Sequence, residues 1–339
     1  MKQKSLFSLL LVLALLVSLT ACGAATQTHA AEPTAAPTAE PTAEPAAAPA
    51  EEPEAEPAGE GVTVTDMTGR EITLDKPAER IVALTAADCE ILCALGAFDT
   101  LVGRGEYCDW PAEVLSVPAV QSGAETSLEQ IIALEPDVLL MGTMAQTAEQ
   151  VAALEDAGIR VVVSDAQDLE GVYTAIELIG RLMGKDAQAE ALCENMRATF
   201  ADVQAQVAGD SSESVYFEVS PLEWGLWTAG KGTFMDEIAG MLGLRNAFDD
   251  IDGWAEISEE QVLERDPDYI VTISMYYGEG PTPTEEILSR AGWENLTAVK
   301  NQAILNLQNN ELSRPGPRLA EGAQMMADFI AAERLENAA

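Results

Sequence analysis

Histidine is nearly absent from this sequence, and basic residues are few. The 339-residue chain has one histidine, His29, and 57 acidic against 18 basic side chains. Residues 61–339 hold 49 acidic and 16 basic side chains, a formal charge of −33, and no histidine. The missing histidine excludes a Ser-His-Asp triad, a histidine-ligated zinc ion and histidine-ligated haem iron from this region. The charge excludes a nucleic-acid partner and disfavours contact with anionic lipid.

Long apolar runs are also missing after the N-terminus. Residues 1–22 contain Lys2 and Lys4, followed by an apolar core from Leu6 to Val17 that is short for a membrane span. This pattern predicts a secretory signal peptide. The signal ends in Leu-Thr-Ala-Cys at Cys22, which resembles a bacterial lipobox and implies lipidation of that cysteine. We therefore expect an extracytoplasmic protein that is anchored to the bacterial membrane by its N-terminal lipid, at the cell surface or in the periplasm.

Residues 23–60 are rich in proline, alanine and glutamate and contain no lysine or arginine. Such a composition cannot bury enough apolar surface to fold. At ~3.1 Å per residue, an extended proline-rich chain of this length reaches at most ~120 Å. We interpret this segment as a disordered stalk between the anchor and a folded body.

Short β-rich segments alternate with helical patterns in the folded body. This alternation is typical of α/β lobes with largely parallel sheets. Residues 169–207 have helical periodicity and no strand signal, which predicts one long connecting helix, bent at Gly184. The sequence thus predicts two Rossmann-like lobes, residues 61–168 and 208–339, joined by this helix, with a ligand cleft between them. The expected strands are 81–84, 101–104, 138–142, 159–163, 215–219, 270–273 and 303–307, and expected helices include 127–134, 147–157 and 233–243.

A duplicated segment supports the two-lobe interpretation. Residues 127–141 read SLEQIIALEPDVLLM and residues 258–272 read SEEQVLERDPDYIVT, so Ser, Glu, Gln, Pro and Asp recur at an offset of 131. In each copy the serine and the glutamine three residues later predict a capping box, and the proline stops the helix before a strand. Glu129 and Glu260 share one position in the first helical turn, where they either stabilise the helix dipole or present matched anionic points to a symmetric partner.

Five sequence motifs resemble those of a known family. They are RIVALTAADCEILCALG, EYCDWPAEV, SLEQIIALEPDVLL, GKGTFMDEIAGMLGLRNAF and LSRPGPRLAEG. In order and spacing they resemble the helical-backbone (class III) substrate-binding proteins of ABC importers, over roughly residues 62–335. The resemblance implies a bound cargo, which is a corrinoid such as cobalamin (vitamin B12), a ferric siderophore or haem, with no catalysis and no resident cofactor. It also implies delivery to a dimeric transmembrane permease with its ATPase, with Glu129 and Glu260 docking on permease arginines.

The same resemblance implies a ligand site with aromatic side chains from both lobes. Aromatic rings suit a flat macrocycle, because they offer large apolar faces at little entropy cost. Cobalamin binders have a tryptophan in the first lobe that finds no counterpart near Gly123 and Ala124, and this departure counts against cobalamin. The predicted ligand-binding residues are Tyr107, Trp110, Trp224, Trp227, Trp254, Asn310 and Arg314.

The other two cargoes would use different contacts. Without histidine, the axial ligand of a haem iron would be a tyrosine, and the candidates are Tyr107, Tyr276 and Tyr277. An anionic ferric siderophore would need arginines in the cleft, and the candidates are Arg104, Arg314 and Arg318. The choice among the three cargoes stays open at the level of sequence.

Other classes of protein fit parts of the sequence. Residues 225–232, GLWTAGKG, resemble a P-loop between a strand and a helix, but Gly232 stands where a P-loop needs serine or threonine after the lysine. A zinc- or manganese-binding lipoprotein would use several histidines. A surface lipoprotein with a structural or interaction role would share the stalk, but it has no need for the matched Glu129 and Glu260.

The four cysteines of the folded body do not predict a metal or redox site. Cys89 and Cys93 lie four residues apart on a predicted helix, without a CxxC spacing or a histidine partner, and this favours buried free thiols, as it does for Cys193. A disulfide that involves Cys108 stays open in an exported protein.

Overall fold

The computed structural model describes residues 61–337 apart from 124–125, 144–146, 208–211, 277 and 309. The predicted signal peptide, Cys22 and the predicted stalk lie outside the described residues. The described part begins with an antiparallel pair, β1 (Val62–Thr65) and β2 (Glu71–Leu74). Asp66 stabilises the turn between them, because one of its carboxylate oxygens accepts hydrogen bonds from the backbone N–H groups of Thr68 and Arg70, both at 3.0 Å.

The N-terminal lobe is built on a five-stranded parallel sheet of order β5-β4-β3-β6-β7. Its side chains alternate between two buried clusters: Ile81 and Leu140 belong to one, and Val82 and Leu139 to the other. Both faces are therefore covered, as a parallel sheet requires. The strands are β3 (Ile81–Ala83), β4 (Leu101–Gly105), β5 (Ala119–Val120), β6 (Val138–Met141) and β7 (Arg160–Val163), and the helices of this lobe include α1 (Ala86–Ala94), α2 (Leu128–Ala133) and α3 (Ala148–Asp156).

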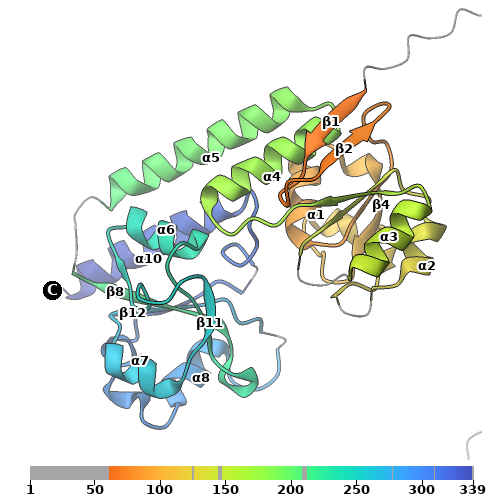
Figure 1. Ribbon diagram of the computed structural model, residues 1–339. Helices are drawn as coiled ribbons and strands as arrows, with labels where there is room; N and C mark the ends of the chain where they lie inside the picture. Colours follow the sequence, from red (N-terminus) through yellow and green to blue (C-terminus); the bar gives the residue numbers. More distant parts are fainter. Residues whose placement is uncertain are drawn as a thin grey trace, which may run out of the picture. The chain divides into compact units, whose positions relative to one another are not determined.

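Residues 169–207 form two helices, so the prediction of one bent helix is wrong. The helices α4 (Leu169–Leu182) and α5 (Asp186–Gln206) lie side by side as an antiparallel pair (Figure 1). Two contacts join α4 and α5 at Tyr173. Cys193 Sγ lies 3.9 Å from the Tyr173 carbonyl oxygen, and the guanidinium of Arg197 lies 4.0 Å from the centre of the Tyr173 ring. The chain reverses at Gly184, whose φ of 63° is the left-handed value that glycine adopts after a helix end. The one long helix that leads into the second lobe is therefore α5 alone.

The C-terminal lobe has a mixed sheet of order β11-β9-β8-β12-β13, with β10 also paired to β8. The strands β8, β10, β12 and β13 are parallel, whereas β9 and β11 are antiparallel to their neighbours. Alternation again places Phe217 in the cluster shared with α4 and α5, and Tyr216 in a second cluster around Phe248 and Trp293. The strands are β8 (Ser214–Ser220), β9 (Trp227–Ala229), β10 (Arg245–Asn246), β11 (Trp254–Glu256), β12 (Tyr269–Thr272) and β13 (Ile304–Asn306).

The first buried cluster is continuous through both lobes. It runs from β3 and α1 through α4 and α5 to β8, α6 and α10. The remaining helices are α6 (Phe234–Met241), α7 (Glu259–Arg265), α8 (Pro283–Ser289), α9 (Thr297–Asn301) and α10 (Leu319–Asn337), and 3₁₀ turns lie at Phe98–Thr100, Ala112–Ser116, Leu222–Trp224 and Trp293–Asn295.

All seven expected strands are present within one residue at each end, and the three expected helices within two. The fold is thus the α/β architecture with two lobes that the sequence predicts. The strands that sequence reasoning missed are β1, β2, β5, β9, β10 and β11, which have two to four residues each.

The duplicated segments fold alike at their helix starts, with one difference. Ser127 and Ser258 are N-caps whose hydroxyl oxygens accept the backbone N–H of Gln130 and Gln261, at 3.4 and 3.3 Å. The predicted capping box is complete at Ser258, where Gln261 Oε1 accepts the Ser258 N–H at 2.9 Å. At Ser127 the prediction of a complete box is wrong, because Gln130 Oε1 accepts the backbone N–H of Gln121.

The ends of the two segments also match. Each helix is followed, directly before its proline, by a residue with left-handed backbone, Glu135 (φ 48°) and Asp266 (φ 41°). Two residues further on, Asp137 Oδ2 accepts the N–H of Arg80, the residue before β3, and Asp268 Oδ2 accepts the N–H of Ser214, the first residue of β8. The two lobes therefore share one helix–turn–strand unit, and it pairs with the neighbouring strand in the same way.

Candidate functional site

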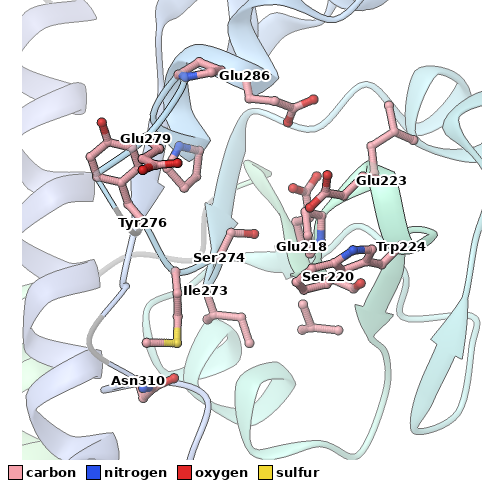
Figure 2. Close-up of a pocket in the computed structure, with 16 residues that line it drawn as sticks. Glu218, Ser220, Glu223, Trp224, Ile273, Ser274, Tyr276, Glu279, Glu286 and Asn310 are labelled. Atoms are coloured by element: carbon pink, nitrogen blue, oxygen red, sulfur yellow. The ribbon is translucent and has the colours of Figure 1, made fainter. Parts of the chain in front are cut away.

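A cavity of about 760 Å³ lies at one edge of the C-terminal sheet. The strands β8 and β12 are parallel, so their carboxyl ends meet at this edge, which is where ligands bind in open α/β sheets. Figure 2 shows Glu223 and Trp224 on one side of the cavity and Tyr276 and Glu279 on the other, with Ser274 between them. The lining residues are Glu218, Val219, Ser220, Pro221, Leu222, Glu223, Trp224, Ile273, Ser274, Met275, Tyr276, Glu279, Pro281, Pro283, Glu286 and Asn310.

Two aromatic rings of this cavity are accessible to a ligand. Trp224 is 72% exposed and ends the 3₁₀ turn that follows β8, where Gly225, at a φ of 88°, redirects the chain. Tyr276 is 38% exposed, and its hydroxyl donates to the Gly280 carbonyl at 3.4 Å. Asn310, with a φ of 67°, lines the cavity and accepts a hydrogen bond from the Ser313 hydroxyl on its Oδ1. Large exposed rings with few rotatable bonds are well suited to bind a flat ligand.

Two of the lining carboxylates are bound to one buried arginine. Arg290 contacts Glu218 at 2.6 Å and Glu286 at 2.5 Å, and its guanidinium lies 4.4 Å from the ring centre of Trp293. Burial raises the pKa of Glu218, although its hydrogen bonds with Arg290 act in the opposite direction. Arg290 is thus the counter-ion of two lining carboxylates.

Two of the predicted tryptophans, Trp227 and Trp254, are not part of the lining of this cavity. Trp227 begins β9 and is 40% exposed. Trp254 begins β11, donates from Nε1 to Gln167 Oε1 at 2.9 Å and packs against Phe234 with ring centres 5.3 Å apart. Neither residue is among those that line the cavity.

The aromatic residues predicted in the N-terminal lobe lie on the loop after β4. Tyr107 is 73% exposed and Trp110 is 47% exposed. The buried Arg104 holds this loop in place, because its Nη1 donates to the carbonyl oxygens of Gly105, Glu106 and Cys108 at 2.9–3.2 Å. The arginine that was a candidate for an anionic siderophore is therefore directed at backbone oxygens.

Arg314 and Arg318 join the two lobes through Glu90 of α1. Arg314 Nη1 lies 2.9 Å from Glu90 and 2.7 Å from Asp109, and Arg318 Nη2 lies 2.7 Å from Glu90. The guanidinium of Arg318 also lies 4.7 Å from the ring centre of Trp110. Burial lowers the pKa of Arg314, but its hydrogen bonds with Asp109 and Glu90 raise it more, so the net shift is upward. We refer to Glu90, Asp109, Arg314 and Arg318 as the inter-lobe brace.

Glu129 and Glu260 are both exposed, in the first turns of α2 and α7. Three residues further along, Ile132 and Leu263 are large apolar side chains that are 41% and 37% exposed. Residues three apart lie on the same face of a helix. Each lobe thus presents one carboxylate with one apolar neighbour, at equivalent positions of the duplicated unit.

The four cysteines of the described residues are free thiols. Cys89, Cys108 and Cys193 are buried and Cys93 is half-buried, so the interpretation as unpaired thiols is confirmed. Burial raises the pKa values of Cys93 and Cys193 to about 11, which keeps both thiols protonated near neutral pH. Within the part of the chain that the structure describes, three or more His, Cys, Asp or Glu side chains do not gather anywhere in a group that could hold a metal ion.

The segment that resembles a P-loop has a different structure. Trp227–Ala229, in its middle, form the strand β9 between β8 and β11. The Lys231 N–H donates to the Ile251 carbonyl at 2.7 Å. Backbone amides that belong to a sheet cannot wrap a phosphate as a P-loop does.

Sequence reasoning missed several lining residues, among them Glu223, Glu279 and Glu286. One signal for part of this site was present: Thr282 and Glu285 form a capping box, with Pro283 at the first helical position, which marks the start of α8. The haem-ligand candidate Tyr276 does line the cavity, whereas Tyr277 lies outside the described residues.

These features define a class of protein: a two-lobe α/β protein with a cavity of small-ligand size at the carboxyl ends of two parallel strands, β8 and β12. Residues 81–311 match the family model described as periplasmic binding protein, and the chain belongs to that family.

Relatives place it among ABC importers. YvrC of Bacillus subtilis, an uncharacterized ABC transporter substrate-binding lipoprotein, is 33% identical over 275 residues, which cover 79% of this chain and 85% of YvrC. A vitamin B12-binding protein of Vibrio cholerae is 26% identical over 255 residues, which cover 75% of this chain and 90% of that protein. A solved structure from Saccharomonospora viridis, described as an ABC-type Fe3+-hydroxamate transport system, is 27% identical with a TM-score of 0.67, and covers 79% of this chain and 98% of that one.

The protein is therefore an extracytoplasmic substrate-binding protein of the kind that serves ABC importers, and it is not an enzyme. Such a protein binds a small ligand and works with a permease and its ATPase. Among the described residues, no helix combines the length and the apolar character that a membrane crossing requires.

Proposed function

We propose that this protein captures a metal chelate, which is a corrinoid, a ferric siderophore or haem, and delivers it to the permease of an ABC importer. The observation that carries the proposal is the cavity at the carboxyl edge of the C-terminal sheet, with Trp224 and Tyr276 on opposite sides. Its volume of about 760 Å³ lies within the range of small-molecule sites. Exposed aromatic rings bind the faces of a macrocycle or chelate with little loss of side-chain entropy.

The names of the relatives support a metal chelate as cargo. The Vibrio cholerae relative is a vitamin B12-binding protein, and the Saccharomonospora viridis structure belongs to an Fe3+-hydroxamate transport system. In our proposal the cargo occupies the cavity beside Trp224 and Asn310, and Tyr107 and Trp110 contact it from the N-terminal lobe. Trp227, Trp254 and Arg314 are proposed as outer contacts.

Equilibrium binding tests the cargo. The full-length protein, purified in mild detergent, is titrated with cyanocobalamin, haem and several ferric siderophores, with tryptophan fluorescence and ligand absorbance as readouts. We expect a submicromolar Kd, which corresponds to more than about 8 kcal/mol of binding free energy, for at least one probe. If every probe binds more weakly than that, the proposed cargo is wrong.

We also propose that Glu129 and Glu260 dock on cationic side chains of the permease. Two equal contact points suit a two-fold symmetric partner, which offers the same surface twice. The exposed Ile132 and Leu263 beside the glutamates would add apolar contact area to each point. A charged residue with an apolar neighbour gives both electrostatic guidance and desolvated area at an interface.

Charge reversal tests the docking. The double variant Glu129→Lys/Glu260→Lys should abolish cellular uptake of the cargo and leave the Kd of the purified protein unchanged, because neither residue lines the cavity. The matched control is Glu190→Lys/Glu194→Lys, which reverses two exposed charges on α5. Normal uptake by the Glu129→Lys/Glu260→Lys cells would refute the docking role.

Anchoring through Cys22 is the third part of the proposal. It is supported by the sequence Leu-Thr-Ala-Cys and by the description of YvrC as a lipoprotein. Cells that express the Cys22→Ser variant should fail to incorporate radiolabelled palmitate into the protein. Labelling of the variant at the level of the natural protein would contradict the anchor.

A further inference from the structure

The cavity is negatively charged. Its sixteen lining residues include Glu218, Glu223, Glu279 and Glu286, and none of the sixteen is a lysine or an arginine. Figure 2 shows these four glutamates distributed around the cavity rather than gathered at one point. Glu223 and Glu279 are exposed, and they lie on opposite sides of the opening. A ligand in this cavity is therefore surrounded by carboxylates.

The cation that binds two of the lining carboxylates does not reverse this charge. Arg290 is bound to both Glu218 and Glu286, and its side chain is only 2% exposed. One positive charge against two negative charges leaves the group with a net formal charge of −1. Together with Glu223 and Glu279, the cavity has a net formal charge of −3.

The arginines considered for an anionic cargo are engaged elsewhere. Arg104 donates to three backbone carbonyls of its own loop, and Arg314 is held by Glu90 and Asp109. Arg318 is bound to Glu90. To contact an anionic cargo, these guanidinium groups would have to leave carboxylates or carbonyls that they already bind, which costs the free energy of those contacts.

The aromatic residues favour the same kind of cargo as the charges do. The faces of Trp224 and Tyr276 attract cations through their ring quadrupoles, and they bind neutral apolar surfaces equally well. Their indole N–H and hydroxyl can each donate one hydrogen bond, but neither residue carries a positive charge to offset a carboxylate or a catecholate that approaches Glu223 or Glu279. The side chains of the cavity therefore discriminate by cargo charge.

We infer that this site selects a cargo that is neutral or cationic at its periphery, such as an amide-bearing corrin or a hydroxamate chelate, and rejects cargoes with peripheral carboxylates or catecholates. The inference rests on the proposed function, because it assigns the chemical class of the ligand that the cavity holds. It narrows the choice among the three cargoes, because it disfavours haem, which carries two propionates, and the anionic siderophores.

Matched probes that differ only in charge test this selectivity. The first pair is cyanocobalamin and the monocarboxylic acids made by hydrolysing one of its side-chain amides. The second series is ferrioxamine B, with a cationic amine, its N-acetyl derivative, which is neutral, and its N-succinyl derivative, which is anionic. Haem and ferric enterobactin complete the set. Each is titrated against the full-length protein in mild detergent at low and high salt.

We expect each added negative charge to weaken binding by about tenfold at low salt, and the difference to shrink at high salt. The variant Glu223→Gln/Glu279→Gln should reduce the difference in Kd between the neutral and anionic probes, because it removes two carboxylates of the cavity. Since both side chains are exposed, we expect the variant to fold normally. The control Glu190→Gln/Glu194→Gln removes two exposed charges from α5 and should leave the difference unchanged.

The outcomes separate the two proposals. Binding of an anionic probe as tight as that of its neutral partner overturns the charge selectivity and leaves the proposed function standing. An unchanged difference in the Glu223→Gln/Glu279→Gln variant overturns the assignment of selectivity to this cavity. If no probe of any charge binds, the proposed function itself fails, and the selectivity fails with it.

Discussion

Removal of the Glu90 carboxylate should destabilise the protein strongly, because this group holds two arginines across the lobes. The Glu90 side chain is 2% exposed, and its oxygens lie 2.7 Å from Arg318 Nη2, 2.9 Å from Arg318 Nε and 2.9 Å from Arg314 Nη1. The side chains of Arg314 and Arg318 are 11% and 9% exposed. The substitution Glu90→Gln keeps the shape and removes the charge that both guanidinium groups face.

The expected cost follows from burial. Breaking a buried ion pair by removing one partner costs about 3–5 kcal/mol, because an uncompensated charge stays in a medium of low dielectric constant. Asp109, whose side chain is 45% exposed, still faces Arg314 after the change, so the lower end, about 3 kcal/mol, is the better expectation. For a folded part of this size, with an unfolding entropy of about 2.1 cal/mol/K per residue, that corresponds to a drop in Tm of about 5 °C.

Urea and thermal unfolding of the full chain in mild detergent, at 0.1 M and at 1 M NaCl, measure the effect. A buried pair is screened little by salt, so the loss should persist at 1 M NaCl. The control is Glu79→Gln, which removes the exposed partner of Lys76 and should leave the unfolding midpoint nearly unchanged. A loss below about 1 kcal/mol, or one that disappears in high salt, would refute a brace that acts through burial.

A second variant, Arg314→Met, separates two roles of Arg314. If Arg314 acts only in the brace, then Arg314→Met and Glu90→Gln should both lower the stability, and the two variants should have the same Kd for cargo. If Arg314 also contacts cargo, as the sequence predicts, then only Arg314→Met should raise that Kd at a temperature at which both variants are folded.

Three further predictions concern single residues. Burial raises the pKa of Asp88 to about 6 from an ordinary value of 3.8, so its protonated form stabilises the fold at low pH and this contribution is lost as the pH rises through 6. Asp88→Asn should therefore stabilise the protein by on the order of 3 kcal/mol at pH 7.5 and by little at pH 4 in urea unfolding. Trp224→Ala should weaken cargo binding by about tenfold or more in calorimetry without changing the Tm, since the ring is exposed. Gly105→Ala should cost about 1–3 kcal/mol in urea unfolding, because the added Cβ would lie 2.2 Å from the Leu84 carbonyl oxygen, between β3 and β4.

The sequence predicted the main strands because parallel strands are buried on both faces and so appear as short continuous apolar runs, as at Val138–Met141. It failed at residues 169–207 because an amphipathic pattern continues on both sides of Gly184. A bend and a full reversal leave the same periodicity, and only the backbone angle at that glycine distinguishes them. The strands β9 and β11, with three residues each, are too short to produce a period.

Prediction of the site was limited by the distance of its parts along the chain. Asn310 was predicted from the family resemblance and Trp224 because it lies on the same loop as Trp227, and both line the cavity. Glu223 and Glu279 could not be told apart from the other acidic residues of the folded body, because nothing local marks them. They become significant only where the carboxyl ends of β8 and β12 bring their loops to the same opening.

The two lobes repeat one unit, and the point at which they stop repeating explains where the proposed cargo pocket lies. In the N-terminal lobe β3 leads through α1 to a parallel partner, β4, whereas in the C-terminal lobe β8 turns back through the 3₁₀ turn at Leu222–Trp224 into the antiparallel β9. That direct reversal places Trp224 at the carboxyl edge of the sheet, where a crossover helix would otherwise begin. On the other side of each central strand the equivalence holds, because α2 and α7 lead to β6 and β12 with the same serine N-caps, left-handed turn residues and strand pairing. In our proposal, a single asymmetric cargo needs only one such pocket, while docking on a two-fold symmetric permease needs two equivalent contacts. The proposal thus accounts for a fold that departs from its internal symmetry on the side that lines the cavity and keeps it at the helices that carry Glu129 and Glu260.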